Sequence, residues 1–486
     1  MFRALWSKFT NLFTDTSKDN QEAEEELSPL VELAFDDFEA HDEGKGIELQ
    51  NSKHINLYFI SDDEHFKHLI QQLLDECWAV IFQKRIEKAE KDGKVEVKPR
   101  KGKHQKVILQ RLIADLYLCN QTDPTRYIRY TRDNNSYSSR YMLKRIGRSH
   151  VTDIVDALCD MGYIESILGF HFSGNSASPI VRAEPKLIEL TDQYKLRPNM
   201  FYESMEQEAI ILKQAKVKAD KQRGIKAEGA KPIGYDETGT VSKMRKSLNA
   251  YNSYLSENNI GLNITKEQFT ALSVFPNRKP NMSATILKRV FNNSSFEQGG
   301  RFYGGWWITL PSQYRKHITI NGKETIELDF KAMHIQIMYS KEGVDMPETD
   351  PYTFDELERD KVKTAMLTVI NANSRADAVN SLSRRRVWPS KSKEEIGAIL
   401  DIFESRHAPI ANWFCSGKGV ELQYIDSKVA DIILTSMRDN HNCLALPIHD
   451  SFIVEVSKEG QLWHEMEQAS LQVTGIHISI ERKSPD

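Results

Sequence analysis

Residues 444–456, LALPIHDSFIVEV, form an apolar run that is interrupted by the polar triplet His449-Asp450-Ser451. An unpaired carboxylate at the centre of a buried strand is costly. The triplet therefore predicts a tight hairpin turn between two short strands, with Asp450 presented at the turn. Residues 324–339, ETIELDFKAMHIQIMY, predict a strand that reaches Asp329 just before a helix. Two acidic side chains, far apart in the sequence, are thus expected at strand ends.

Asp329 and Asp450 together have the chemistry of a site for divalent cations. Carboxylate oxygens are hard ligands that suit Mg²⁺, and two-metal sites hold their ions about 3.5–4 Å apart. We expect two Mg²⁺ ions here, with Mn²⁺ as an alternative ion. The competing interpretation is that both residues only cap turns.

Residues 358–372, ERDKVKTAMLTVINA, lie between the two acidic motifs and predict a helix. Arg359 and Lys363 are one turn apart and share a face of that helix. Two neighbouring cations repel, so the pair indicates an anion such as a triphosphate. A solvated helix face is the alternative, and only the position between the two carboxylate motifs gives the pair weight.

The order of these motifs resembles motifs A, B and C of family A DNA polymerases and of single-subunit phage-type RNA polymerases. Gly300-Arg301, with TLP and Arg315 after it, resembles the segment that contacts primer–template in family A enzymes. IHDSF resembles motif C of the phage-type RNA polymerases. Residues 421–434 and 454–483 are similar to the helix before motif C and to the end of the family A palm. The resemblance covers about residues 246–486.

The resemblance implies an α+β fold of the right-hand polymerase type, with an antiparallel palm sheet and helical fingers and thumb. In the sequence, the thumb corresponds to about 246–300, the palm to about 301–345 and 420–486, and the fingers to about 346–419. We expect thumb helices at 248–259 and 283–293. No upstream segment resembles the family's 3′–5′ exonuclease domain, so proofreading is not expected.

The resemblance also implies a mechanism, two-metal nucleotidyl transfer from nucleoside triphosphates to a primed template, most simply DNA. Asp329 and Asp450 are then the metal ligands, and Lys363 is the candidate to protonate the leaving group. The remaining expected contacts are nucleotide binding by Arg359, Lys363, His334 and Asn371, and primer or template binding by Arg301, His449 and Tyr303. In 300–307, GRFYGGWW, the aromatic residues suit stacking on bases, and a buried strand is an equal alternative.

Two departures from the family bear on the choice of sugar. His334 stands where family A DNA polymerases keep a Glu, and its bulk favours deoxynucleotides over ribonucleotides. Asn371 replaces the aromatic residue at the end of motif B, and TAMLTV looks more like the RNA-polymerase version. We therefore expect a DNA polymerase, with an RNA polymerase or primase as the alternative. A DNA-binding regulator with an inactive palm is an alternative of another class.

Residues 105–198 resemble a winged helix: a helix, a turn region, a second helix and a β-hairpin follow one another. The second helix can enter the DNA major groove, and winged helices also serve protein contacts. Its expected DNA-binding residues are Arg145, Arg148, Ser149 and His150, with Ser149 as the helix N-cap. We expect residues 199–245 to be a helix that runs into a flexible linker.

The first half of the chain carries two further segments. Residues 1–50 begin as an amphipathic helix and continue as an acidic tail. That helix packs on the chain's own body or docks on a protein partner or a membrane surface. Residues 51–104 are expected to be helical, with a basic loop at 93–106.

Overall composition excludes several classes of protein. The chain has 486 residues, with 65 basic and 69 acidic side chains. Its five cysteines form no Cys-x-x-Cys pair, which argues against a zinc site or a disulfide scaffold and fits a reducing cytoplasm. No apolar run approaches the roughly 18 residues of a membrane span.

Overall fold

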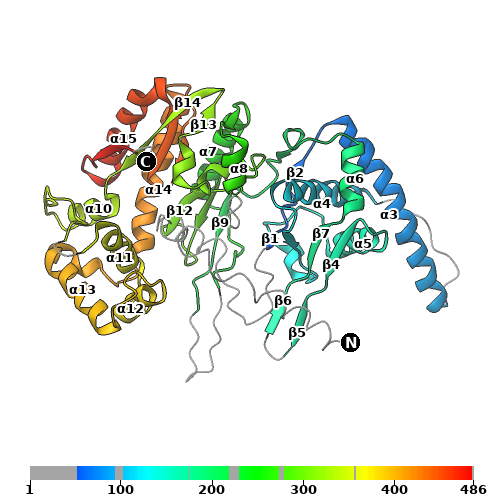
Figure 1. The fold of residues 1–486 in the computed structure, drawn as a ribbon, viewed down its shortest axis with the longest axis horizontal. Coiled ribbons are helices and arrows are strands. Elements are labelled where there is room, and N and C mark those ends of the chain that lie inside the picture. The colour runs from blue at the N-terminus through cyan, green and yellow to red at the C-terminus, as the bar shows by residue number, and fades with distance from the viewer. Residues whose placement is uncertain are drawn as a thin grey trace. The chain divides into compact units, whose positions relative to one another are not determined.

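The central sheet of the C-terminal half has six antiparallel strands (Figure 1). Five of them follow the order β10-β13-β14-β16-β15, and β17 also pairs with β14. This computed structural model describes residues 52–93, 102–172, 175–217, 229–272, 279–354 and 357–483. The predictions for residues 1–50 lie outside these ranges. The strands are β10 (Ile260–Leu262), β13 (Ile318–Ile320), β14 (Lys323–Phe330), β15 (Leu446–Ile448), β16 (Ser451–Glu455) and β17 (Ile480–Arg482).

The hairpin predicted around Asp450 is confirmed. Strands β15 and β16 pair so that Ile448 faces Ser451, which leaves His449 and Asp450 as the two-residue turn. His449 has a φ of 59°, in the left-handed region that tight two-residue hairpins require. All five residues of β16 are buried. The strand therefore carries an almost unbroken apolar sequence.

Helices pack on this sheet, and they lie where the sequence predicted helices for this part of the chain. The strand ending near Asp329 leads into a helix, as expected, and the segments 421–434 and 454–483 contain the expected helices. Their bounds are α10 (Met333–Lys341), α14 (Gly419–Asp439) and α15 (Glu459–Thr474). In Figure 1, α15 lies beside β14 and runs along the sheet. Mixed α/β structure with an antiparallel sheet is thus confirmed.

A second, three-stranded sheet in the order β12-β11-β9 lies against α14. Its strands are β9 (Ile210–Leu212), β11 (Lys288–Phe291) and β12 (Gly299–Tyr303), and the helix expected at 248–259 is α7 (Gly239–Ser256). The helix expected at 283–293 was wrong, because that segment contains β11. Pairing with β12 on one side and β9 on the other satisfies both edges of β11 and overrides its helix-like apolar spacing.

The segment between β14 and α14 is helical, as expected for the fingers. It contains α11 (Arg359–Asn371), α12 (Arg375–Arg384) and α13 (Lys393–Arg406), and two short helices elsewhere are α8 (Lys266–Ala271) and α9 (Ser312–Arg315). Ser392 caps α13 by accepting from the Glu395 backbone N–H at 3.2 Å, in a capping box. Buried Ile396, Leu400 and Phe403 show the i, i+4, i+7 spacing of one apolar helix face.

The N-terminal half has a four-stranded sheet in the order β1-β3-β7-β4. Its elements are β1 (Ser52–His54), β2 (Phe59–Ile60), α3 (Glu64–Lys91), α4 (Lys103–Thr122), β3 (Tyr127–Arg129), α5 (Arg148–Asp160), β4 (Ile164–Ile167), β5 (Phe170–Phe172), β6 (Asn175–Ala177), β7 (Ile180–Ala183), α6 (Pro185–Gln193) and β8 (Tyr202–Glu203). The expected order of helix, turn region, helix and hairpin is present. Gly162, with a φ of 72°, follows the end of α5 as predicted.

Two predictions in this half were wrong in detail. Helix α5 begins at Arg148 with Gly147 as its N-cap, so Ser149 lies inside the first turn. The His150 side chain accepts from the Gly147 N–H at 3.0 Å, so a ring on the first turn of α5 serves the backbone donor at the N-cap. The helix expected from residue 199 is also missing from the described residues 199–217, where β8 and β9 stand instead. Pairing of β9 with β11 explains the extended chain there.

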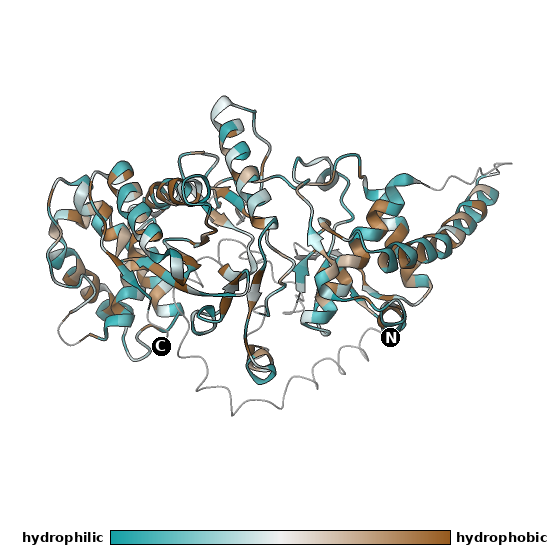
Figure 2. Cartoon of the chain, turned by 90° about the horizontal axis from the view of Figure 1, so that it is seen from above, coloured by the Kyte–Doolittle hydropathy of each residue, from teal (hydrophilic) through white to brown (hydrophobic). Residues whose placement is uncertain are grey.

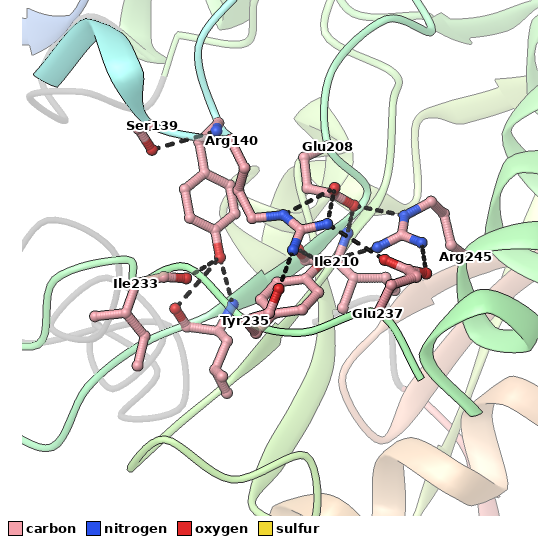
Figure 3. Close-up of polar contacts among 10 residues, drawn as sticks. Ser139, Arg140, Glu208, Ile210, Ile233, Tyr235, Glu237 and Arg245 are labelled. Atoms are coloured by element: carbon pink, nitrogen blue, oxygen red, sulfur yellow. Dashed lines mark hydrogen bonds and ion pairs between the residues drawn. The ribbon is translucent and has the colours of Figure 1, made fainter. Parts of the chain in front are cut away.

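Arg140 ties the two halves together through a charged network (Figure 3). Its guanidinium lies 3.5 Å from the Tyr235 ring centroid and 3.1 Å from Glu208 Oε2. Glu208 Oε1 also accepts from Arg245 Nε at 2.8 Å. Beside this network, Tyr141 Oη donates to the Ile233 carbonyl at 2.8 Å. Glu208, Ile233, Tyr235 and Arg245 therefore make specific contacts within the segment 199–245, which was expected to end in a flexible linker.

Apolar side chains gather in two cores, one within residues 57–201 and one within residues 209–478. Figure 2 shows brown and teal on opposite sides of many helices, as amphipathic packing requires. Among the described residues, no helix combines the length and the apolar character that a membrane span needs.

Candidate active site

Asp329, near the C-terminal end of β14, lies next to Asp450 in the turn of the β15–β16 hairpin. In the antiparallel register, Asp329 pairs with Ser451, the residue after Asp450. The Phe330 N–H also donates to the Asp450 carbonyl at 3.3 Å. Burial, and then the charge of Asp450, raise the pKa of Asp329 well above its usual range. The predicted convergence of these two acidic residues is thus present in the fold.

The two oxygens of Asp329 have different surroundings. Oδ2 lies 3.2 Å from Lys483 Nζ. Oδ1 is buried and has no hydrogen-bond partner. A buried carboxylate oxygen without a donor is costly unless a cation binds it. The carboxylate therefore offers one oxygen for an additional ligand.

This donor set fits Mg²⁺ or Mn²⁺ bound largely through water and substrate. Mg²⁺ typically uses one or two protein carboxylates together with waters and substrate phosphates. Asp329 and Asp450 supply that number, and the orphaned Oδ1 supplies a ligand atom. Within the described ranges no group of three or more His, Cys, Asp or Glu residues could hold a metal on its own. A closed structural metal site is therefore not what this arrangement resembles.

A third carboxylate, Glu327, lies next to the site and is fully engaged. Glu327 and Asp329 are two residues apart on β14 and point to the same face of the sheet. Ser451 Oγ donates to Glu327 Oε1 at 2.7 Å, and Arg315 Nη1 and Lys483 Nζ each lie 3.3 Å from the same oxygen. Burial alone would raise the pKa of Glu327, but these cations and the Ser451 hydroxyl lower it. Sequence reasoning missed Glu327 and Lys483.

Arg301 and His334 meet on a buried acid that the sequence analysis did not single out, Asp426 of α14. Arg301 Nη2 lies 2.5 Å from Asp426 Oδ2, and Arg301 Nε lies 3.2 Å from Oδ1. His334 Nε2 lies 2.8 Å from Asp426 Oδ2. Burial would raise the pKa of Asp426, but the Arg301 charge and the His334 contact outweigh it and lower the pKa. An acid on the otherwise apolar face of 421–434 was the available signal.

His449 and Tyr303 are neighbours in the site. Their ring centroids are 5.5 Å apart, and the planes meet at 62°. Burial, with Arg301 nearby, lowers the pKa of His449 to about 3, so the ring is neutral at pH 7. His449 Nδ1 is buried and has no partner. The predicted primer-binding residues Arg301, Tyr303 and His449 therefore gather beside Asp450.

The tryptophans of 300–307 are buried, as in the alternative interpretation, but they stand in a short 3-10 helix (Trp306–Ile308) and not in a strand. Trp307 is fully buried, and its Nε1 donates to the Pro447 carbonyl of β15 at 3.1 Å. Trp306 is 3 % exposed. Neither ring is available to stack on a base in this arrangement. Trp307 instead supports the strand that leads to Asp450.

Arg359 and Lys363 share one face of α11, as predicted, and both flank the ring of Tyr352. Arg359 Cζ lies 5.7 Å and Lys363 Nζ lies 6.0 Å from the Tyr352 ring centroid. Arg359 Nη2 also lies 2.7 Å from Asp350 Oδ2. Burial, followed by the charge of Asp450, raises the pKa of Tyr352 above its usual range. Tyr352 therefore interacts with the cationic face of α11 and is also within electrostatic range of Asp450.

His407 contacts the backbone next to Tyr352. Sequence reasoning found neither residue. His407 Nε2 lies 3.1 Å from the Pro351 carbonyl, and Nδ1 lies 3.0 Å from Tyr339 Oη. His407 is 2 % exposed, and burial lowers its pKa. A single aromatic in a polar loop gives no sequence signal that would mark it.

Asn371 lies at the last turn of α11, away from the cationic face. Its Nδ2 donates to the Leu367 carbonyl at 2.8 Å. A Cβ added at Gly419 would lie 2.3 Å from Asn371 Oδ1, so the side chain packs directly on the start of α14. In this arrangement Asn371 serves a helix–helix contact.

The expected DNA-binding residues of the N-terminal half lie at the start of α5. Arg145, Arg148 and Ser149 are exposed, and Arg145 has a φ of 65°. His150 is half-buried, and its ring centroid lies 5.0 Å from that of His104. Three of the four residues are therefore accessible to a partner.

Among known proteins, the chain shows similarity to solved structures but not to family models or curated sequences. No family model and no curated protein matches the sequence. The POL domain of Pol1 from M. smegmatis, in complex with DNA primer-template and dNTP, is similar with a TM-score of 0.32 and 12 % identity. The match covers 44 % of this chain and 50 % of that chain.

Proposed function

We propose that this chain is a template-dependent nucleotidyltransferase of the family A type, most simply a DNA polymerase without a proofreading exonuclease. The observation that carries the proposal is the convergence of Asp329 and Asp450, with the buried Asp329 Oδ1 lacking a partner. Asp329 and Asp450 would hold two Mg²⁺ ions, and such ions would supply activation of a primer 3′-hydroxyl and stabilisation of the triphosphate.

The chain's own residues divide the remaining work. Arg359 and Lys363 bind the triphosphate, because both project from one face of α11 beside Tyr352. Lys363 donates a proton to the leaving pyrophosphate. The triphosphate competes with Asp350, which holds the Arg359 guanidinium at 2.7 Å.

Primer positioning falls to His449 and Tyr303. His449 is neutral and keeps Nδ1 free, so it can accept or donate one hydrogen bond near the primer end. Arg301 acts from behind these rings: its guanidinium is bound to Asp426, so it contributes rigidity and positive potential.

The choice of deoxynucleotides rests on His334. Its contact with Asp426 fixes a bulky ring on α10, and such a ring leaves less room for a ribose 2′-hydroxyl. An RNA polymerase or primase is the alternative, favoured by IHDSF and TAMLTV in the sequence and by the absence of an aromatic at Asn371. We propose that His334 is the selecting residue.

The N-terminal half is proposed to be a winged helix that delivers the enzyme to DNA. The order β3-β7-β4, the preceding helix α5 and the exposed Arg145 and Arg148 support this assignment. A regulator with an inactive palm would need only this half.

The test is extension of a primed template with deoxynucleotides or ribonucleotides, with and without Mg²⁺. Asp450→Asn and Asp329→Asn should each lower incorporation by a factor of 10³ or more, on the order of the loss of a required metal ligand. Asp439→Asn, at the exposed C-terminal end of α14, is the matched control and should retain activity. Full biological activity in Asp450→Asn would favour the regulator, and a preference for ribonucleotides would favour the RNA polymerase.

A further inference from the structure

Lys483 binds the two carboxylates of β14 at once. It follows β17 directly, and its backbone N–H donates to the Glu327 carbonyl at 2.9 Å. Its Nζ lies 3.3 Å from Glu327 Oε1 and 3.2 Å from Asp329 Oδ2. Its side chain is 33 % exposed, so solvent and ions still reach it.

Lys483 and Arg315 are the cations that form ion pairs with the acids of β14 in the described part of the chain. The acids in these pairs are Glu327 and Asp329, and Arg315 lies 3.3 Å from Glu327. Arg315 is anchored away from Asp329, since its Nε donates to the Leu310 carbonyl at 3.0 Å. Among the described side chains, Lys483 is the cation for which an ion pair with Asp329 is seen.

We propose that the Lys483 ammonium is the internal counter-ion of the metal site: it neutralises Asp329 in the metal-free chain, and a divalent cation binds against its charge. The inference rests on the proposed function, because it takes Asp329 as a metal ligand. It goes further by naming a residue that sets the metal concentration the site needs.

The arrangement of the Asp329 oxygens supports this role. Lys483 occupies Oδ2 and leaves Oδ1 unpartnered. A cation bound at Oδ1 would sit within a few ångströms of the ammonium, where like charges repel strongly in a partly buried site. Removing the ammonium should therefore tighten divalent binding, even though it removes a stabilising contact from the metal-free fold.

Binding of Mn²⁺ to the full-length chain, followed by electron paramagnetic resonance, tests the inference directly. Lys483→Met should lower the Mn²⁺ dissociation constant roughly three- to tenfold, and Lys483→Arg should stay near wild type because it keeps the charge. Lys331→Met is the matched control, because Lys331 directly follows β14, pairs with Glu481 of β17 at 3.1 Å, and forms no ion pair with Asp329 among the described side chains. An unchanged or larger dissociation constant in Lys483→Met would overturn the proposal.

Thermal unfolding separates a counter-ion from a merely structural lysine. A ligand that binds only the native state raises Tm, and the rise grows with the logarithm of the ratio of ligand concentration to Kd. Lys483→Met should lower Tm in a chelator and show a larger Mn²⁺-induced rise than wild type. An equal loss of Tm with and without Mn²⁺ would instead mean that Lys483 only supports the packing of β17 on β14.

Two further variants separate this inference from the proposed function. Asp329→Asn and Asp450→Asn should each weaken Mn²⁺ binding in the same assay. If neither does, the metal site itself is misplaced and both proposals fail. If both do, but Lys483→Met binds Mn²⁺ no more tightly, only the counter-ion proposal fails.

Discussion

Arg301 and Asp426 form a buried ion pair that joins β12 to α14, with Arg301 Nη2 2.5 Å from Asp426 Oδ2. The Asp426 side chain is 1 % exposed. A pair so placed stabilises the fold only while both partners are present, because an isolated buried charge is strongly disfavoured. His334 is the third member of the pair's network, so the residue proposed to select the sugar depends on it.

Asp426→Asn should destabilise the chain by about 3–5 kcal/mol, because it leaves the Arg301 guanidinium buried beside a neutral amide. Urea unfolding at pH 7 gives the free energy directly. The matched control is Asp439→Asn at the C-terminal end of α14, where the Asp439 side chain is 51 % exposed and pairs with Arg438. Exposed ion pairs contribute little, so its loss should cost clearly less. Equal losses would show that Asp426 carries no special burden.

Stability of the metal-free chain should depend on pH through Asp329. Its pKa is raised in the folded state, so the folded state binds this proton more tightly than the unfolded state. The stability it contributes is present below the unfolded pKa of about 3.9 and is lost as pH rises through the folded pKa. Asp329→Asn does not titrate and should gain stability relative to wild type on going from pH 5 to pH 8.

Urea unfolding in a chelator at both pH values measures this difference. We expect the advantage of Asp329→Asn over wild type to grow by more than about 1 kcal/mol, the equivalent of roughly one pKa unit. A constant difference between the two proteins would show that Asp329 keeps an ordinary pKa.

Sequence reasoning located the parts of the site that depend on chain order and polarity. Asp450 was recognisable because a charge interrupts an apolar strand, and Asp329 because a strand ends there. The hairpin places Asp450 at the β15–β16 turn, and the long-range pairing of β14 with β16 then brings Asp329 beside it. Lys483 and Tyr352 gave no such signal, because they matter through contacts with residues distant in the sequence. Asp426 was marked only by its place on an otherwise apolar helix face.

The wrong secondary-structure predictions have a common physical cause. Residues 286–291 have apolar spacing that suits a helix, with Ile286 and Leu287 four residues before Val290 and Phe291. Residues 288–291 form β11 because strands on both sides offer hydrogen bonds. One of those strands, β9, lies within the segment expected to be a helix and a flexible linker. Local propensity is a weak guide wherever pairing is between distant segments.

Tyr352 should matter for nucleotide binding, because its ring lies against both cations of α11. Tyr352→Ala should raise KM for the incoming nucleotide about tenfold, equivalent to about 1.4 kcal/mol. Tyr352→Phe keeps the ring and should stay within about twofold of wild type if packing is the cause. Steady-state primer extension measures both values. A KM unchanged in Tyr352→Ala would remove this residue from the nucleotide site, whereas a loss in both variants would point to the hydroxyl.

Gly304 allows the chain to turn from Tyr303 toward the buried tryptophans, and this position should tolerate no side chain. Its φ is 113°, and an added Cβ would lie 2.3 Å from the Ile286 carbonyl oxygen. Gly322→Ala is the matched control, since Gly322 also has a positive φ, 77°, but an added Cβ would meet nothing within 4 Å. The control should lose only about 1–2 kcal/mol of stability, the penalty for a side chain on a left-handed backbone.

Gly304→Ala should lose at least about 1 kcal/mol more stability in urea unfolding, because either β11 or β12 has to move. It should also lower incorporation, since Tyr303 lies next to His449. Equal unfolding free energies for the two variants would contradict this prediction. They would show that the turn at Gly304 can accommodate a methyl group despite its close approach to Ile286.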